Sequence, residues 1–324
     1  MMLPSMNRVK PLFATALCSS LLAGLFCALP PAPAAAQPYQ WDDSMKGTVV
    51  SGLSYPNLVT DKESQRLRFV AFGDSGTGSV EQWKLAGQME HLNKFYPFSL
   101  MLMLGDNIYP NGGQFYKYGA KRFREPYLNL YKGGVRLMPV LGDRDVALGY
   151  SKPMLDYYGM PASYYDYTVG PVHFFAIDTN AFDNTQKEWL RERLDQSISP
   201  WKVVYGHHPV FSSSGLGGSP AMQKHLKPSL EIYGADLYLS SHNTGYERFR
   251  EVEHVNYLVT GGGGAPLEKF AAEPQPQSVK RLQMHHFVVF DVTPKALSYA
   301  VVDEKGNMVD KGILQKEEAN AVKP

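Results

Sequence analysis

Cysteine is almost absent from this chain of 324 residues, which has only Cys18 and Cys27. Both fall within a segment that predicts a secretory signal, because an apolar stretch from Leu12 to Leu29 follows a basic start and the small residues Ala34–Ala36 follow a proline cluster. The alternative for this segment is an uncleaved membrane anchor. Cleavage after Ala36 would leave no thiol, so that disulfides are excluded and any metal must be held by oxygen or nitrogen ligands.

An excess of one charge sign is also missing, since 32 Lys and Arg stand against 31 Asp and Glu. This balance gives no basic footprint for nucleic acid, and no second apolar run reaches the length of about 20 residues that a membrane span requires. With 44% hydrophobic residues the chain has enough apolar material for a large core. We therefore expect an exported globular protein, periplasmic or secreted, whose oligomeric state the sequence leaves open.

The chain divides into three parts: a signal at residues 1–36, a polar lead-in at 37–66 and one large domain at 67–324. No repeat of 20 to 50 residues is present. Short apolar runs alternate with amphipathic segments over the first part of the domain, whereas apolar runs dominate its end. This order predicts an α/β fold with layered sheets and with polar loops gathered at the strand ends. The expected helices are 80–92 and 186–194, the second of them capped by Thr185.

Five predicted strands end in a carboxylate or an imidazole. The first three, 67–72, 99–104 and 136–141, each run into a Gly-Asp pair, and strands at 202–205 and 237–239 run into histidines. Any single Gly-Asp pair is adequately explained as a turn. A turn does not explain the whole series. The series is expected to bring five side chains to one edge of a sheet: Asp74, Asp106, Asp143, His207 and His242. Carboxylates and imidazoles without thiols suit one or two ions of Fe, Zn or Mn.

The segments at these strand ends resemble a known family. They read Gly73-Asp74-Ser75-Gly76, Gly105-Asp106-Asn107-Ile108-Tyr109, Gly142-Asp143-Arg144-Asp145, Gly206-His207-His208-Pro209 and Ser241-His242-Asn243-Thr244. Their order and spacing are similar to those of the calcineurin-like metallophosphoesterases, in particular the tartrate-resistant or purple acid phosphatases. The resemblance runs from about Phe69 to Val292. It implies a four-layer αββα sandwich with mixed sheets and an active site in the loops at the carboxyl ends of the strands.

The resemblance also implies a two-metal site for hydrolysing phosphate monoesters by attack of a metal-activated water. Asp106 would bridge the two ions. Asp74 and Tyr109 would bind the first ion, and Asp143, His207 and His242 the second. The expected partner is a small phosphorylated substrate, which Arg144 and His208 would face.

Two positions depart from the family pattern, which has Gly-Asn-His in the third segment and a second histidine in the fifth. Asp143 replaces the asparagine, and its carboxylate oxygen is an acceptable ligand. Arg144 replaces the histidine and stays protonated, so it cannot act as a general acid, although it can grip a phosphate oxygen. Thr244 replaces an imidazole ligand of the first metal. These changes leave a second interpretation open, a pseudophosphatase that binds metal, an anion or a partner protein without turnover.

Two further features have plainer explanations. The four glycines 261–264 lack the Lys-Ser/Thr ending of a phosphate-binding loop, so a flexible turn between strands is favoured over a phosphate cradle. The basic residues of the segment 117–124 are interpreted as a solvated face, with attraction of an anionic substrate as the alternative.

Overall fold

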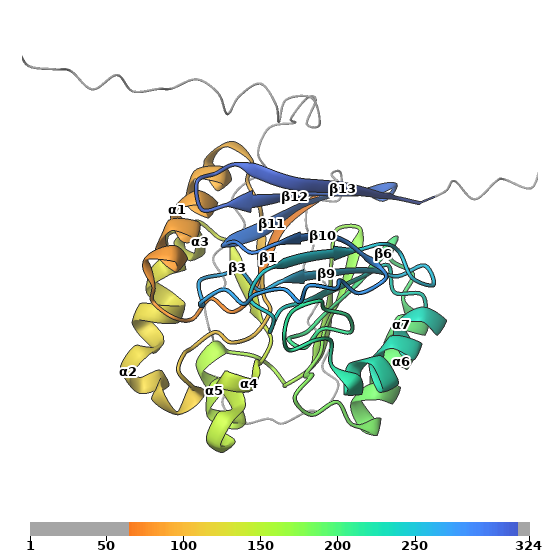
Figure 1. Cartoon of the computed structure of the whole chain (residues 1–324), viewed down its shortest axis with the longest axis horizontal. Coiled ribbons are helices and arrows are strands. Elements are labelled where there is room, and N and C mark those ends of the chain that lie inside the picture. Colours follow the sequence, from red (N-terminus) through yellow and green to blue (C-terminus); the bar gives the residue numbers. More distant parts are fainter. Residues whose placement is uncertain (1–64, 317–324) are drawn as a thin grey trace, which may run out of the picture. The chain divides into compact units, whose positions relative to one another are not determined.

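Apolar runs form the centres of two mixed β-sheets in the computed structural model, which describes residues 65–316 (Figure 1). The predicted signal and nearly all of the lead-in lie outside these residues, and both stay predictions. The six-stranded sheet contains, in spatial order, β13 (Met308–Gln315), β12 (Ala296–Asp303), β11 (His286–Val292), β1 (Leu67–Phe72), β2 (Leu100–Met103) and β3 (Arg136–Pro139). Within it, β1 runs parallel to β2 and antiparallel to β11.

The second sheet has seven strands and supplies the histidines of the site. Its spatial order is β10 (Ser278–Leu282), β8 (Tyr246–Phe249), β9 (Asn256–Thr260), β7 (Leu237–Ser240), β6 (Trp201–Tyr205), β5 (Val172–Ala176) and β4 (Tyr165–Val169). The four strands β5, β6, β7 and β9 are parallel, so their carboxyl ends lie at one edge of the sheet. The loops after β6 and β7 carry His207 and His242.

Helices cover the outer faces of the two sheets. Figure 1 places α1, α2 and α3 on one side and α6 and α7 on the other, as the expected four-layer sandwich requires. The helices are α1 (Val80–Phe95), α2 (Phe115–Gly119), α3 (Leu128–Lys132), α4 (Asp143–Val146), α5 (Ser151–Tyr158), α6 (Asn184–Gln196) and α7 (Lys227–Ile232). Short helical turns occupy Gly112–Gln114, Ala120–Arg124, Glu125–Tyr127, Ala147–Gly149 and Met222–Leu226.

Aromatic side chains join the two sheets. The Phe69 ring of β1 meets the Phe174 ring of β5 edge-on, with 5.1 Å between ring centroids, and stacks on Phe290 of β11 at 4.5 Å. A second apolar cluster fills the outer face of the seven-stranded sheet, where Leu190 and Leu194 of α6 are fully buried. These two clusters hold the strand ends in fixed positions relative to one another.

The predicted element types are confirmed, with shifts at the ends. The first helix reaches Phe95 instead of residue 92, and the predicted strand at 99–104 extends only over Leu100–Met103. The expected cap of α6 was wrong. Asp183, not Thr185, precedes the first turn, and its carboxylate accepts from the Gln186 backbone N–H at 2.8 Å. Asp183 wins because its extended backbone (φ −84°, ψ −179°) is the conformation of an N-cap residue.

Candidate metal centre

The loops after β1 and β2 hold each other in place and present Asp74 and Asp106. The Asp74 backbone N–H donates to the Gly105 carbonyl at 3.0 Å, and the Gly76 N–H donates to the Asp106 carbonyl at 3.2 Å. Both aspartates have left-handed backbones, with φ of 55° and 53°, a conformation that aspartate adopts more readily than most residues. A side chain on Gly105 (φ 92°) would lie 2.6 Å from His207 Nδ1, so only glycine fits there.

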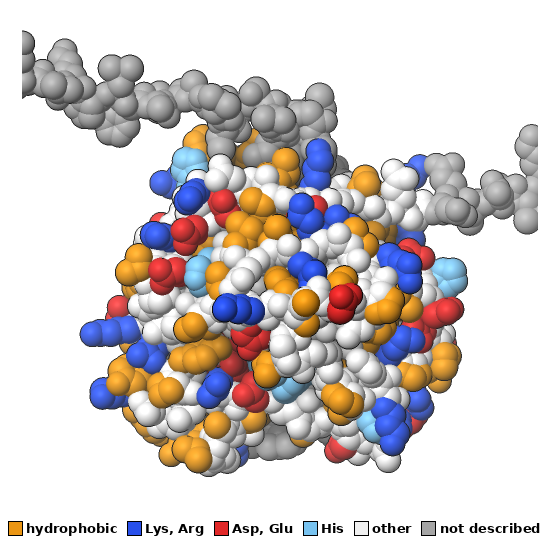
Figure 2. Space-filling model, viewed as in Figure 1, with side chains coloured by type: hydrophobic (Ala, Val, Ile, Leu, Met, Phe, Trp, Pro, Cys, Tyr) orange, Lys and Arg blue, Asp and Glu red, His pale blue; other side chains and the backbone are white. Residues whose placement is uncertain are grey.

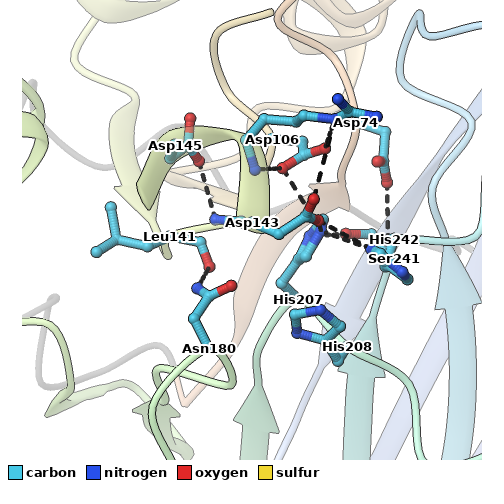
Figure 3. A network of polar contacts seen from close by, with 12 residues as sticks. Asp74, Asp106, Leu141, Asp143, Asp145, Asn180, His207, His208, Ser241 and His242 are labelled. Atoms are coloured by element: carbon cyan, nitrogen blue, oxygen red, sulfur yellow. Dashed lines mark hydrogen bonds and ion pairs between the residues drawn. The ribbon is translucent and has the colours of Figure 1, made fainter. Parts of the chain in front are cut away.

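Three side chains meet within hydrogen-bonding distance beside these loops (Figure 3). Asp143 Oδ1 lies 3.0 Å from His207 Nε2 and 3.0 Å from His242 Nδ1, and the two ring nitrogens are 3.2 Å apart. Asp106 Oδ1 is 3.5 Å from His207 Nε2. His242 also has a left-handed backbone (φ 65°), and its backbone N–H donates to Asp74 Oδ2 at 2.9 Å.

The spacing of these atoms fits a metal ion. Nitrogen and oxygen ligands bind such ions at about 2.1 Å, so neighbouring ligands lie about 3.0 Å apart around an octahedral ion and about 3.4 Å apart around a tetrahedral one. Asp143, His207 and His242 show separations in this range without any rearrangement. Candidate ligand atoms of Asp74, Asp106 and His207 form a second group that lies within 4.8 Å. The structure thus brings together all five strand-end residues that the sequence singles out.

Tyr109 completes the side of the centre next to Asp74. Its hydroxyl donates to Asp74 Oδ1 at 3.0 Å. Burial, followed by the charges of Asp74 and Asp106, raises the pKa of Tyr109 far above its ordinary value. A phenolate therefore forms here only beside a strongly polarising cation.

Burial and mutual repulsion shape the charges of the centre. Burial raises the pKa of Asp74 to about 7 and also raises that of Asp106. Asp143 differs: burial alone would raise its pKa, but hydrogen bonds from His207 and His242 outweigh burial and hold it well below the usual range. Burial alone would lower the pKa of His207, whereas the charge of Asp106 and the hydrogen bond and charges of the other carboxylates raise it to about 10. This excess of carboxylates in a buried space favours a cation.

Arg144 and His208 stand at the edge of the same centre. The Arg144 Nε lies 3.9 Å from a carboxylate oxygen of Asp106 and 3.9 Å from one of Asp143, and 54% of its side chain is exposed. His208 is held by Thr179, whose Oγ1 accepts from the His208 backbone N–H at 3.0 Å and lies 2.8 Å from the ring Nδ1. Since Oγ1 already accepts one proton there, its own proton is available to Nδ1. Thr179 follows β5 and was not among the residues singled out from the sequence.

Asp145 connects two loops of the centre. It was not identified as a functional residue from the sequence. It is fully buried and accepts hydrogen bonds from the backbone N–H groups of Gly142 (2.9 Å), Asn107 (3.1 Å) and Ile108 (3.2 Å) and from the Tyr158 hydroxyl (2.7 Å). It therefore ties the loop of Asp143 to the loop of Asp106. Its place in the third segment, two residues after Asp143, is the signal that could have found it.

A family profile described as calcineurin-like phosphoesterase matches residues 67–245. The chain belongs to this family. Among curated relatives, this calcineurin-like phosphoesterase is 26% identical over 257 residues to human tartrate-resistant acid phosphatase type 5, covering 66% of this chain and 78% of that protein. It is also 26% identical over 247 residues to purple acid phosphatase 3 of Arabidopsis thaliana, covering 65% and 67%.

Two solved structures share the fold of this phosphoesterase. Purple acid phosphatase PPD1 from yellow lupin superposes with a TM-score of 0.69 at 18% identity, covering 77% of this chain and 54% of that one. GAP50, described as the anchor in the inner membrane complex of Plasmodium, superposes with a TM-score of 0.66 at 20% identity, covering 79% and 90%. The predicted fold and the predicted resemblance are both confirmed. The family is dimetal-dependent, and the Asp and His cluster of this chain is a possible metal-binding site.

In the fifth segment of this phosphoesterase, Thr244 does not supply a metal ligand. The Thr244 hydroxyl donates to the Pro266 carbonyl at 2.7 Å and accepts from the Glu268 N–H at 2.8 Å, so both of its roles are filled away from the centre. The first metal position therefore has Asp74, Asp106 and Tyr109 as candidate ligands, and Thr244 does not supply a fourth.

The glycine run and the basic segment both have structural roles. All four glycines 261–264 are buried, and the run is a packed loop, because the Gly263 N–H donates to the Gly73 carbonyl at 3.0 Å and the Ala265 N–H to the Asp74 carbonyl at 2.9 Å. In the basic segment, Arg122 donates to the Tyr109 carbonyl and Arg124 lies 4.7 Å from the Tyr157 ring.

On the face in Figure 2, acidic and basic side chains are interspersed, as the balanced composition predicts. No helix among residues 65–316 is both long and apolar enough to cross a membrane.

Proposed function

We propose that this calcineurin-like phosphoesterase is an exported, metal-dependent phosphatase that hydrolyses small phosphate monoesters. The observation that carries the proposal is the preformed group of Asp143, His207 and His242, whose ligand atoms lie 3.0 to 3.2 Å apart beside Asp106. These four residues would hold the second metal. Asp74, Asp106 and Tyr109 would hold the first, with Asp106 shared between the two.

Bound metal ions supply a water of lowered pKa and positive charge against the phosphoryl oxygens. Around them, the chain's own groups orient the ester. Arg144 is half exposed and close to both Asp106 and Asp143, so its guanidinium is placed to grip a phosphate oxygen through charge-assisted hydrogen bonds. Thr179 fixes the His208 ring through Nδ1, which leaves the Nε2 proton available for a second hydrogen bond to the ester.

This arrangement restricts the substrates. Arg144 stays protonated at all working pH values and cannot deliver a proton to the departing oxygen. The reaction therefore favours esters whose alcohol leaves without protonation, such as aryl phosphates, over simple alkyl phosphates.

A second candidate, a pseudophosphatase, is favoured by one specific observation. Thr244 directs its hydroxyl to Pro266 and Glu268 and leaves the first metal with three candidate ligands. A chain whose first metal position is weak or empty would retain the fold and a charged pocket for an anion or a partner protein. GAP50, which is described as an anchor, shares the fold, and this supports the second candidate.

Metal analysis of a paired variant separates the two candidates. The mature chain and Arg144→His/Thr244→His would be loaded with Fe, Zn or Mn, and bound ions counted alongside the hydrolysis of a chromogenic phosphate monoester at acid and neutral pH. A phosphatase gives turnover in the parent chain. Turnover that appears only in the double variant, with a second metal gained, would establish the pseudophosphatase.

A further inference from the structure

A small cavity lies beside the fifth segment, next to the metal centre. Asn243 and Thr244, which follow His242, form one wall, and Glu247 of β8 lies on the same side. The other residues that line the cavity are Ser212, Ser214, Gly245, Val259, Glu268 and Phe270. The polar groups of this lining are carboxylates, hydroxyls and one amide, so the cavity differs in chemistry from the histidine-containing metal centre.

Two buried oxygen atoms of this lining have no hydrogen-bond partner: Asn243 Oδ1 and Glu268 Oε2. The Asn243 side chain is only 3% exposed, and its Nδ2 is fixed by donating to the Ser214 hydroxyl oxygen, so the amide presents its oxygen and not its nitrogen as the free atom. Leaving buried acceptors unpaired destabilises the fold, because they have lost their hydrogen bonds to water. A bound ligand with positive charge or donor groups would remove this cost.

Two carboxylates line the cavity, those of Glu247 and Glu268. Glu247 is fully buried, and its carboxylate accepts from the Ser213 N–H at 2.7 Å and from the hydroxyls of Ser213 and Ser278. Within residues 65–316, no Lys or Arg forms an ion pair with Glu247 or Glu268. Arg281 is the cross-strand partner of Glu247, but its guanidinium lies 5.5 Å from the centre of the Phe270 ring and donates to the Ala271 carbonyl. Two carboxylates in so small a space call for a cation.

We propose that this cavity binds a hard divalent cation of the calcium class, held by oxygens of Asn243, Glu247 and Glu268. Calcium takes carboxylate and amide oxygens together with water, whereas the softer metals of the neighbouring centre prefer imidazole. Glu268 is joined to the fifth segment through Thr244, because its N–H donates to the Thr244 hydroxyl oxygen. A cation here would fasten the chain around Asn243 and so stabilise the turn that carries His242.

Calcium binding to the intact, transition-metal-loaded chain tests this site directly. Equilibrium dialysis against calcium should show one ion per chain beyond the ions of the metal centre, with a Kd on the order of 10⁻⁴ to 10⁻³ M, the range of weak oxygen-only sites. Glu268→Gln removes a charge but keeps the side-chain shape, and should weaken calcium binding at least about tenfold. Asn243→Asp adds a charge at the free oxygen and should tighten it.

Glu273→Gln is the matched control, since Glu273 is exposed, lies five residues further along the chain and does not line the cavity. It should leave calcium affinity within about twofold of the parent value. Any of three results overturns the site: no calcium bound at about 10 mM, well above the expected Kd; equal weakening by both glutamate changes; or release of the calcium when Zn²⁺ fills the metal centre. None of these depends on whether the protein hydrolyses phosphate esters.

Discussion

Replacing Asp145 by asparagine tests how the loops of the metal centre are held. The Asp145 carboxylate accepts from five donors: the backbone N–H groups of Gly142, Asn107 and Ile108, the Asn107 side-chain amide and the Tyr158 hydroxyl. An amide keeps one oxygen and turns an NH₂ group toward these donors. If two of the five lose their partner in the buried site, the free energy of unfolding falls by about 2–6 kcal/mol, since each unpaired buried group costs about 1–3 kcal/mol. Because the loops also carry Asp143 and Asp106, metal affinity should fall with it.

The assay is urea unfolding of parent and variant at pH 8, since burial raises the pKa of Asp145 to about 7 and the carboxylate is charged above that value. Asp183→Asn is the control, because Asp183 accepts only from the Gln186 N–H as a helix cap and asparagine caps equally well. A loss of stability in Asp145→Asn no greater than in Asp183→Asn would refute the reasoning.

Three further predictions follow from single contacts. Asp143→Ala removes the oxygen that lies between His207 and His242, and should weaken binding of the second metal more than about 100-fold in a chelator competition, the upper range for residues that merely support ligands. Because Arg144 cannot protonate a leaving group, the rate should fall steeply from aryl to alkyl phosphates; equal rates would contradict this. Burial lowers the pKa of His286 to about 4. As the pH falls below about 6.5, the unfolded chain therefore takes up a proton before the folded chain does, and the free energy of unfolding should drop by up to ~3 kcal/mol by pH 4. His286→Gln should flatten that pH dependence.

Much of the fold and the centre of the site were predictable because each depends on local sequence. Apolar runs of four to six residues that end in Gly-Asp mark both a strand and the polar group at its end, and parallel strands bring such ends to one edge. Strand ends of this kind identified Asp74, Asp106, Asp143, His207 and His242. The resemblance then added Tyr109, and the structure places it beside Asp74.

The remaining features depend on contacts between distant segments. Thr179 contacts His208 across 29 residues, and Asp145 reaches Asn107 across 38, and neither pairing leaves a periodic trace in the sequence. Thr244 could be recognised as a departure, but only the structure shows that its hydroxyl is occupied by Pro266. The cap of α6 was misplaced for a local reason: Asp183 and Thr185 are both good caps, and the backbone conformation decides between them.

The most direct test of the account is the turnover of a chromogenic aryl phosphate by the mature chain reconstituted with Fe, Zn or Mn. The arrangement of Asp106, Asp143, His207 and His242 predicts metal-dependent hydrolysis. Asp106→Asn should reduce it at least about 100-fold, because in the proposed ligand assignment both metals would share that carboxylate. Absence of hydrolysis with every metal, in a folded chain shown to bind metal, would contradict the phosphatase and leave the pseudophosphatase.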